Sequence, residues 1–342
     1  MTRRATAQDV ADLAGVSRSA VSLVLNGRAD GNISQAKQEA VREATRALRY
    51  TPDAVAISLR SKRTATIGVL TWSDQRQLPT VLLGAIYEAA SSAGYLLMMI
   101  DALQRPGQVD ALLDRRVDGF LVVAPELSDF TVPERVAAVP TVMINCFDPS
   151  FDSLSGASWL VPDEVGAGAS AAQHLLDVGH RRIGVLVGTE GLASRRRLQG
   201  LTHALAAAGA PGPSLLRVGR SIDDGYAAAL GLLGSDDPPT AVVCVHERLA
   251  LGALLAATNL GLCVPDDVSL VSLDDGENLA GRLVPSIDLV ERPDALIAKH
   301  AIELLVERLR HDGSSVQRLT FVCRVTPGAS VAPPRLGALP FG

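Results

Sequence analysis

Aromatic residues make up only 4% of this chain, and its cysteines are few and scattered: Cys146, Cys244, Cys263 and Cys323. With no Cys-x-x-Cys pair, we interpret them as small core residues in a reducing compartment rather than disulfides or metal ligands. No run of about 18 apolar residues is present, so no membrane-spanning helix is expected. Basic residues near the N-terminus are not followed by an apolar segment, which argues against a signal peptide and favours a cytoplasmic protein.

The motifs of common enzymes are also missing. His246-Glu247 lacks the second histidine of a His-Glu-x-x-His zinc site, and no Gly-x-Ser-x-Gly is present. The segment 166–171 fits the Gly-x-Gly-x-x-Ala pattern of dinucleotide sites, but it does not follow a buried apolar strand. Small residues at the start of a helix explain it. We therefore expect no metal, no cofactor and no enzymatic activity.

Charge is unevenly distributed along the 342 residues. The net charge is −5, yet residues 1–63 hold 11 Lys and Arg against 6 Asp and Glu, while the remainder holds 21 against 31. A small basic module therefore precedes a large acidic body. The basic part is where the phosphates of a nucleic acid would be met.

The basic part begins with two short helical patterns, TAQDVADLA and SRSAVSLVLN, separated at Gly15. Val10, Leu13 and Ala14 have the spacing of one apolar helix face. Thr6 is placed to cap the first helix and Ser17 the second, with Gly15 at the break. A short capped helix with outward polar side chains suits the DNA major groove, although a solvated helical hairpin would show the same pattern.

The next 38 residues predict a third helix and a linker. A polar loop covers 27–32, and Ser34 is placed to cap a helix that runs to about Leu48. After Pro52, the segment 54–59 has helical spacing but is too short to be stable alone in water. We expect it to fold on docking to a partner, and the polar run 60–64 to be a linker.

From Ala65 onward apolar runs alternate with helical patterns, which predicts parallel strands covered by helices. Strands are expected at 66–70, 96–100, 120–124, 141–145, 183–187, 241–245, 268–273, 287–290 and 319–325. Helices are expected near 79–93, 108–115, 164–178, 193–208, 222–234, 248–260 and 293–310. Nine strands are many for one open sheet. The irregular stretch 146–163 therefore suggests a crossing between two subdomains.

Several motifs together resemble the lac repressor family of transcription regulators. They are Asp9-Val10-Ala11-x-x-Ala14-Gly15-Val16-Ser17, Val21-Ser22-x-Val24-x-Asn26, Tyr50-x-Pro52-x-x-x-Ala56-x-x-Leu59, Val117-Asp118-Gly119, Gly179-His180-Arg181-Arg182-Ile183, Arg197-x-x-Gly200, Val264-Pro265-x-Asp267-Val268-Ser269 and Asp274-Asp275. Each motif is weak alone, but together they cover about residues 5–332.

The resemblance implies an all-α helix-turn-helix headpiece followed by an α/β effector body of two subdomains, similar to type I periplasmic binding proteins. We expect the DNA-binding domain at 1–51, a hinge helix and linker at 52–64, and the effector and dimerisation domain at 65–342. Its N-subdomain would cover about 65–162 and 289–319, and its C-subdomain about 163–288 and 320–336. A homodimer on a pseudo-palindromic operator is implied, with operator affinity controlled by a small molecule, most simply a sugar.

The site residues follow from the same reasoning. Candidates for DNA contact are Thr6, Ser17, Arg18, Ser19, Ser22, Leu23 and Asn26, with Ala56 and Leu59 where the family inserts a leucine into the minor groove. Candidates for effector contact are Trp72, Asp74, Phe147, His246 and Glu247 at strand ends, and Arg197 and Asp274 at family positions. Leu23 departs from the arginine common in the family, so the operator is expected to differ. For Arg197 and Asp274 a structural salt bridge is the alternative role.

Two other classes of protein fit parts of this pattern. A solute-binding protein would share the body, but the basic head and the missing signal peptide argue against it. A sugar-modifying enzyme lacks a catalytic constellation. The identity of the effector, and whether it releases or strengthens DNA binding, are not given by the sequence.

Overall fold

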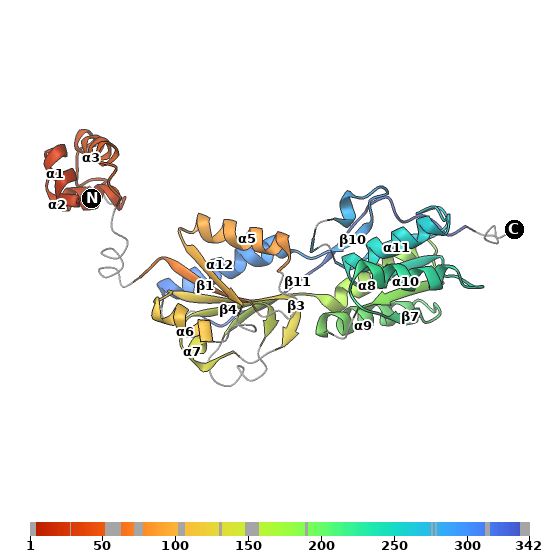
Figure 1. Ribbon diagram of the computed structural model, residues 1–342. Coiled ribbons are helices and arrows are strands. Elements are labelled where there is room, and N and C mark those ends of the chain that lie inside the picture. The colour runs from red at the N-terminus through yellow and green to blue at the C-terminus, as the bar shows by residue number, and fades with distance from the viewer. Residues whose placement is uncertain are drawn as a thin grey trace. The chain divides into compact units, whose positions relative to one another are not determined.

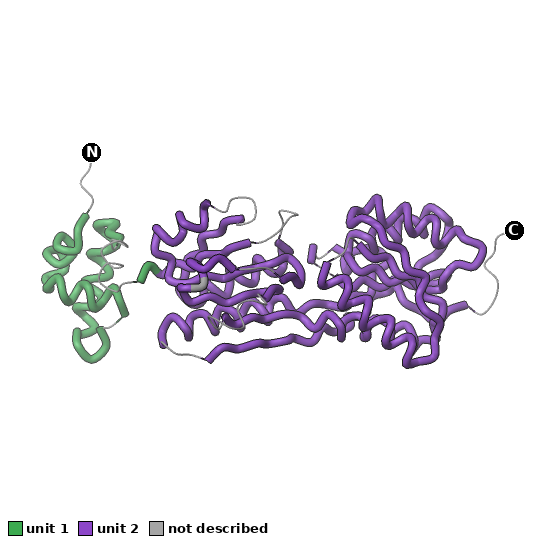
Figure 2. Tube along the Cα trace, turned by 90° about the horizontal axis from the view of Figure 1, so that it is seen from below, with its two compact units in different colours: residues 1–64 green, residues 65–342 purple. Residues whose placement is uncertain are grey.

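The protein is described from a computed structural model. It describes residues 5–27, 29–51, 63–71, 78–101, 107–129, 132–147, 157–188, 191–274, 276–277, 279–311 and 315–335. The chain divides into two compact units, residues 1–64 and 65–342 (Figure 2). We call them the headpiece and the body, and each is described by itself.

The described helices are α1 (Ala7–Ala14), α2 (Arg18–Leu25), α3 (Gln35–Ala47), α5 (Thr80–Ser92), α6 (Gly107–Asp114), α7 (Glu134–Ala137), α8 (Glu164–Asp177), α9 (Leu192–Ala207), α10 (Ile222–Leu233), α11 (Glu247–Asn259), η1 (Ala280–Arg282) and α12 (Asp294–Arg310). The strands are β1 (Thr66–Thr71), β2 (Leu96–Asp101), β3 (Gly119–Asp129), β4 (Thr141–Phe147), β5 (Ser158–Pro162), β6 (Ile183–Val187), β7 (Ser214–Arg217), β8 (Ala241–Cys244), β9 (Ser269–Ser272), β10 (Asp288–Glu291), β11 (Arg318–Phe321) and β12 (Arg324–Thr326).

The headpiece is a three-helix unit whose ends are fixed as the sequence predicts. Thr6 and Asp9 form a reciprocal capping box at α1, and Gly15 ends that helix at φ 65°. The Ser17 hydroxyl accepts a hydrogen bond from the Ala20 amide at 3.2 Å. Val10, Val21 and Val41 meet in the small core. The capped turn therefore sets the angle between α1 and α2.

Two expectations for the headpiece are wrong. Leu13 is 58% exposed, because the buried face of α1 is formed by Val10 and Ala11 instead. Ser34 stands at the start of α3, but its hydroxyl makes no capping hydrogen bond. The 3.6-residue period alone does not fix which edge of an apolar stripe faces the core.

The body contains two six-stranded sheets, each with helices on both faces (Figure 1). The first sheet has the order β11-β5-β4-β3-β1-β2, and all of its pairs are parallel. Apolar residues of α5 and α12 cover one face, and those of α6 and α7 the other. The central strands β1, β3 and β4 are buried on both faces for this reason.

The second sheet has the order β12-β10-β9-β8-β6-β7. Its pairs are parallel except for the antiparallel pair of β10 with β12. Helices α8 and α9 cover one face, while α10 and α11 cover the other. Each subdomain is therefore a three-layer α/β unit.

The chain passes between the two sheets three times, after β5, after β10 and between β11 and β12. Because β10 belongs to the second sheet, the chain returns to the first subdomain after Glu291, where the sequence had suggested residue 288. In the same way β11 extends the first sheet to Phe321 rather than 319. Arg292, directly after β10, lies 3.9 Å from Asp274 of the candidate site described below.

Three further differences concern single elements. The predicted strand at 319–325 is two strands, β11 and β12, which belong to different sheets. Strands β5 and β7 lie in segments where no strand was expected, because β5 carries a proline and β7 is four residues long with mostly exposed side chains. Cys263 is exposed, so it is not a core residue, unlike the other three cysteines.

Glycines allow two pairs of helices to cross at backbone contact. A Cβ atom on Gly168 of α8 would lie 1.8 Å from the Arg197 carbonyl oxygen, and one on Gly200 of α9 would lie 1.9 Å from that of Val165. In the same way, a Cβ atom on Gly225 of α10 or on Gly252 of α11 would overlap backbone atoms of the other helix. The Gly-x-Gly-x-x-Ala pattern at 166–171 therefore lies at a helix crossing.

The first strand of the body is anchored next to the start of β3. The Ala65 amide donates to the Asp118 carboxylate at 2.9 Å, and the Asp118 amide donates to the Thr66 carbonyl at 2.8 Å. The point where the chain enters the body is therefore tied to the residue that precedes β3.

Candidate DNA-reading helix and effector cavity

Helix α2 presents a row of polar side chains to solvent. Arg18 and Ser19, in its first turn, are exposed, and Asn26 is exposed at its C-cap. The Asn26 amide donates to the Ser22 carbonyl at 2.6 Å and to the Ser22 hydroxyl at 3.1 Å. Leu23 is half-buried on this helix. Arg18 is thus the cation of the helix, while Asn26 is held in place by Ser22.

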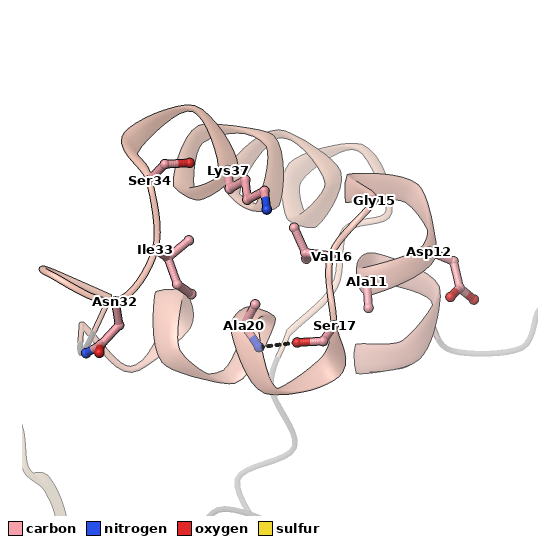
Figure 3. A pocket seen from close by; sticks show the side chains of 10 residues that line it. All are labelled: Ala11, Asp12, Gly15, Val16, Ser17, Ala20, Asn32, Ile33, Ser34 and Lys37. Carbon is pink, nitrogen blue, oxygen red and sulfur yellow. Dashed lines mark hydrogen bonds between the residues drawn. The ribbon is translucent and has the colours of Figure 1, made fainter.

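A hollow of about 670 Å³ lies within the headpiece, between α2, α3 and the turn after α1 (Figure 3). Its lining combines small apolar side chains with a few polar ones. Figure 3 shows Ala20 and Ile33 facing this space, with Lys37 above them. The hollow contains no converging cluster of charged groups, so we do not regard it as the effector site.

A larger cavity, about 890 Å³, is lined by residues from both subdomains of the body. The first subdomain contributes Thr71, Leu78, Pro79, Thr80, Leu83, Met99, Ile100, Asp101, Pro125 and Glu126, and the second contributes Arg220, Ser221, His246, Glu247, Arg248, Asp274, Gly276, Glu277 and Leu279. Many of these residues follow the carboxyl ends of parallel strands, where α/β proteins bind ligands. The volume is in the range of small-molecule sites.

His246 links several polar groups at the cavity wall. Its Nε2 atom lies 3.2 Å from the Ser194 hydroxyl, and its Nδ1 atom lies 3.3 Å from an Arg220 nitrogen. The Asp274 carboxylate lies 3.8 Å from the same Nδ1. Burial lowers the pKa of His246 and outweighs the opposing effect of Asp274. His246 is therefore neutral at neutral pH and acts as a hydrogen-bonding group.

Asp274 is a carboxylate of the cavity that stays charged. Burial by itself would raise its pKa, but the cations around it, with Arg292 first, hold that pKa far below its usual range. Its side chain is 18% exposed, and its Oδ1 atom accepts a hydrogen bond from the Gly276 amide at 3.1 Å. A charged, partly accessible carboxylate is a strong acceptor for ligand hydroxyl or amine donors.

Glu247 lines the cavity, but its carboxylate also holds the following loop. It accepts backbone N–H groups of Glu277, Leu279 and Ala280 at 2.6–2.8 Å. Burial raises its pKa, while these three hydrogen bonds oppose the rise. The described contacts of Glu247 thus fix the segment before η1.

Arg197 is fully buried and is not among the residues that line the cavity. Its guanidinium donates to both oxygens of Glu164, at 2.5 and 3.1 Å, and to the Val245 carbonyl at 2.8 Å. Burial would lower its pKa, yet Glu164 and Asp274 raise it. This is the structural salt bridge that the sequence left open as an alternative, and Glu164 was not identified from the sequence.

Phe147 also lies outside the cavity lining. Its ring contacts Trp159 at a centroid distance of 6.2 Å, and the Arg196 guanidinium lies 5.7 Å from its centroid. Phe147, at the end of β4, thus packs between Trp159 of β5 and helix α9, in a cluster that also includes Leu127 and Ala193. In this arrangement it joins the two subdomains.

Three residues at or near the cavity were missed by sequence reasoning. Glu126 of β3 forms an ion pair with Arg220, which precedes α10. Asn145 of β4 is fully buried at φ 56°, and its side-chain amide has no hydrogen-bond partner among the described residues. Glu126 and Asn145 both lie near the carboxyl ends of strands. Recognition of β7 would have placed Arg220 at such an end.

Four candidates lie outside the described residues. They are Ala56 and Leu59 of the expected hinge and Trp72 and Asp74 after β1. Of the other effector candidates, the structure brings His246, Glu247 and Asp274 to one cavity. Arg197 lies behind its wall, bonded to the Val245 carbonyl, and Phe147 packs elsewhere, against Trp159 and Arg196.

Comparison with known proteins now identifies the family. Residues 6–53 match the model of bacterial regulatory proteins of the lacI family, and residues 172–331 match that of a periplasmic binding protein-like domain. The HTH-type transcriptional repressor PurR of Mannheimia succiniciproducens is 30% identical over 90% of this chain and 92% of its own length. This chain belongs to the lacI family of bacterial regulatory proteins.

Two other lacI-family relatives add to the comparison. The ribose operon repressor of Haemophilus influenzae is 30% identical over 92% of this chain and 95% of its own length. A solved complex of the transcriptional regulator CelR with cellobiose is 28% identical, with a TM-score of 0.67, over 96% of this chain and all of that one. The names of these relatives are those of transcriptional regulators rather than enzymes, and the solved CelR chain shares the fold described here.

The structure itself adds two observations about function. Among the described residues, no three His, Cys, Asp or Glu side chains are grouped so that they could hold a metal ion. Within the described ranges, every helix is too short or too polar to cross a membrane.

Proposed function

We propose that this lacI-family regulator is a repressor that binds a pseudo-palindromic operator as a homodimer and is controlled by a small, hydroxyl-rich effector, most simply a sugar. The cavity lined by both subdomains carries this proposal. A ligand bound there contacts both subdomains at once, so its affinity depends on how the two subdomains are arranged. That difference in affinity supplies the free energy for a change in operator binding.

The headpiece supports recognition of duplex DNA through α2. Its exposed first turn offers the Arg18 guanidinium and the Ser19 hydroxyl, and Asn26 lies at the other end of the helix. Such side chains read base edges or bind phosphates in the major groove. Leu23 offers only apolar contact, as with a thymine methyl, so we expect the operator to differ from sites read by an arginine there.

Exposed apolar side chains on both subdomains support a homodimer. In the first subdomain Tyr87 is 64% exposed and Leu96 is 73% exposed. In the second, Leu255 is 54% exposed and Val284 is 97% exposed. Such side chains gain free energy where a second copy of the chain covers them and removes them from water. A two-fold dimer would present one α2 helix to each half-site of a palindrome.

The polar groups of the cavity support a hydroxyl-rich effector. Asp274 accepts hydrogen bonds as a permanent carboxylate, while the Arg220 guanidinium provides donors on the same cavity wall. Adjacent acceptors and donors match the paired hydroxyl groups of a sugar. The similarity to a regulator solved with cellobiose and to a ribose operon repressor favours the same ligand class.

Arg18→Ala is expected to weaken operator binding by about 10- to 100-fold, which corresponds to a lost bidentate base contact. Fluorescence anisotropy on a duplex selected from a randomised palindrome library measures this change, and sedimentation of the complex should show two chains per duplex. Lys299→Ala, which removes an exposed cation of the body, is the matched control. Equal operator affinity in the Arg18→Ala protein and the wild type would show that the assignment of α2 is wrong.

Asp274→Asn is expected to abolish stabilisation by the effector, because the amide keeps the shape of the carboxylate but not its charge. A thermal-shift panel of monosaccharides, cellobiose and purine bases identifies the ligand, which at 100 times its Kd stabilises the wild type by about 2.7 kcal/mol. Asp110→Asn, in an exposed ion pair with Arg135, is the control. An Asp274→Asn protein stabilised as strongly as the wild type would rule out this role, and a hit among the purine bases alone would replace the sugar.

A further inference from the structure

Strand β3 is irregular where it reaches the cavity. Its register with β4 runs evenly to the pair Val123 and Ile144 and resumes at the pair Ser128 and Cys146. Four residues of β3 therefore lie opposite Asn145 alone. Bulges of this kind redirect side chains, and they are common next to functional sites.

Three consecutive residues of this bulge contact the second subdomain or the peptide segment that leads back from it. We call Pro125, Glu126 and Leu127 the clasp. The Pro125 carbonyl accepts from Arg292, directly after β10, at 3.0 Å. Glu126 forms its ion pair with Arg220, and Leu127 packs in the cluster that contains Ala193 of α9. The clasp is thus a concentrated contact between the two subdomains.

The ion pair is the part of the clasp that faces the cavity. Glu126 and Arg220 both line the cavity, with side chains 16% and 24% exposed. Arg220 also contacts His246, so it bridges one carboxylate of the first subdomain and the polar groups around Asp274 in the second. Leu127, by contrast, makes apolar contacts, and Pro125 contributes its backbone carbonyl, which accepts from Arg292.

The strength of an ion pair that joins two subdomains across a cavity depends on the distance between the subdomains. If the subdomains move apart by a few ångströms, the ion pair between Glu126 and Arg220 breaks and both side chains become hydrated. Part of the lost attraction is then regained from water, so the pair favours one arrangement without preventing the other. The second oxygen of Glu126 is buried and has no hydrogen-bond partner among the described residues, so nothing else described fixes this carboxylate.

We propose that the Glu126–Arg220 ion pair is a latch that sets the equilibrium between this arrangement of the two subdomains and a more open one, before any effector is bound. The latch rests on the proposed function in one respect: the effector is taken to shift this same equilibrium between the two arrangements. The apparent affinity for the effector depends on the fraction of protein already in the arrangement that binds it. A latch that changes this fraction therefore changes the apparent affinity, even without contacting the ligand.

Hydrogen exchange of the full-length, ligand-free protein tests the latch. Glu126→Gln and Arg220→Gln are each expected to speed amide exchange at 124–129 and 191–196 by about threefold or more, because the subdomains separate more often. The double variant should exchange no faster than either single variant, since the same contact is lost in each. Asp237→Asn, which breaks an exposed ion pair with Arg182 inside the second subdomain, should leave both segments unchanged.

Operator affinity provides the functional measurement. On the selected duplex, without ligand, both single variants should change affinity in the same direction, and the charge swap Glu126→Arg with Arg220→Glu should restore most of the wild-type value. Unchanged exchange in folded Glu126→Gln protein, or additive effects in the double variant, would overturn the latch. If exchange changes as expected but no panel compound binds, the effector assignment fails while the latch stands.

Discussion

Glu164→Ala is expected to lower the free energy of unfolding by about 3–5 kcal/mol, because it leaves the Arg197 guanidinium buried without its counter-charge. Arg197 is fully buried, and both carboxylate oxygens of Glu164 accept from it. The Val245 carbonyl is the remaining acceptor among its described contacts. Urea unfolding followed by circular dichroism measures the loss.

Two further variants show where this energy comes from. Glu164→Leu combined with Arg197→Met removes both charges and should recover most of the lost stability, as replacement of a buried ion pair by apolar groups often does. Asp110→Asn removes a pair whose side chains are more than half exposed, and should change stability by less than about 1 kcal/mol. A loss below about 1 kcal/mol in Glu164→Ala would mean that Arg197 reaches water or another acceptor.

Gly200→Val is expected to lower the free energy of unfolding of the body by about 3 kcal/mol or more, because the valine side chain would overlap backbone atoms of α8. Its Cβ alone would lie 1.9 Å from the Val165 carbonyl oxygen. Helices α8 and α9 would have to separate, which would disturb the core they share with the second sheet. Thermal and urea unfolding of the purified variant measure the effect.

The matched control is another helical glycine. Gly231 of α10 has open space where a Cβ would lie, so Gly231→Ala should be neutral or stabilise by up to about 1 kcal/mol through helix propensity. Equal stability of Gly200→Val and Gly231→Ala would contradict the close crossing of α8 and α9.

The sequence predicted the fold where periodicity and continuous apolar runs are strong. Strands β1 and β6 and the helices that follow them lie close to the expected ranges, because both faces of these strands are buried. The short edge strand β7 escaped notice, since one polar or exposed side of a strand removes the apolar run. Sequence alone also could not divide 319–325 between two sheets, because that depends on pairing partners far along the chain.

For the candidate site, the sequence located residues that directly follow strong strands. His246 and Asp274 are of this kind, and they line the cavity. Glu126 was missed because β3 continues through a bulge beyond its apolar run, and Arg220 because its preceding strand was missed. The pairing of Arg197 with Glu164 spans 33 residues between neighbouring helices, and no local pattern signals such a contact.

Strand β3 connects the place where the chain enters the body with the cavity. Asp118, just before this strand, holds the backbone of Ala65, and the clasp lies toward its other end. The two points are about 25 Å apart along a strand that rises 3.3 Å per residue. From Phe120 to Val123 this strand is paired on both sides, with β1 and with β4, and the bulge that contains the clasp follows directly. We therefore expect a displacement at the clasp to reach Ala65 along the sheet itself.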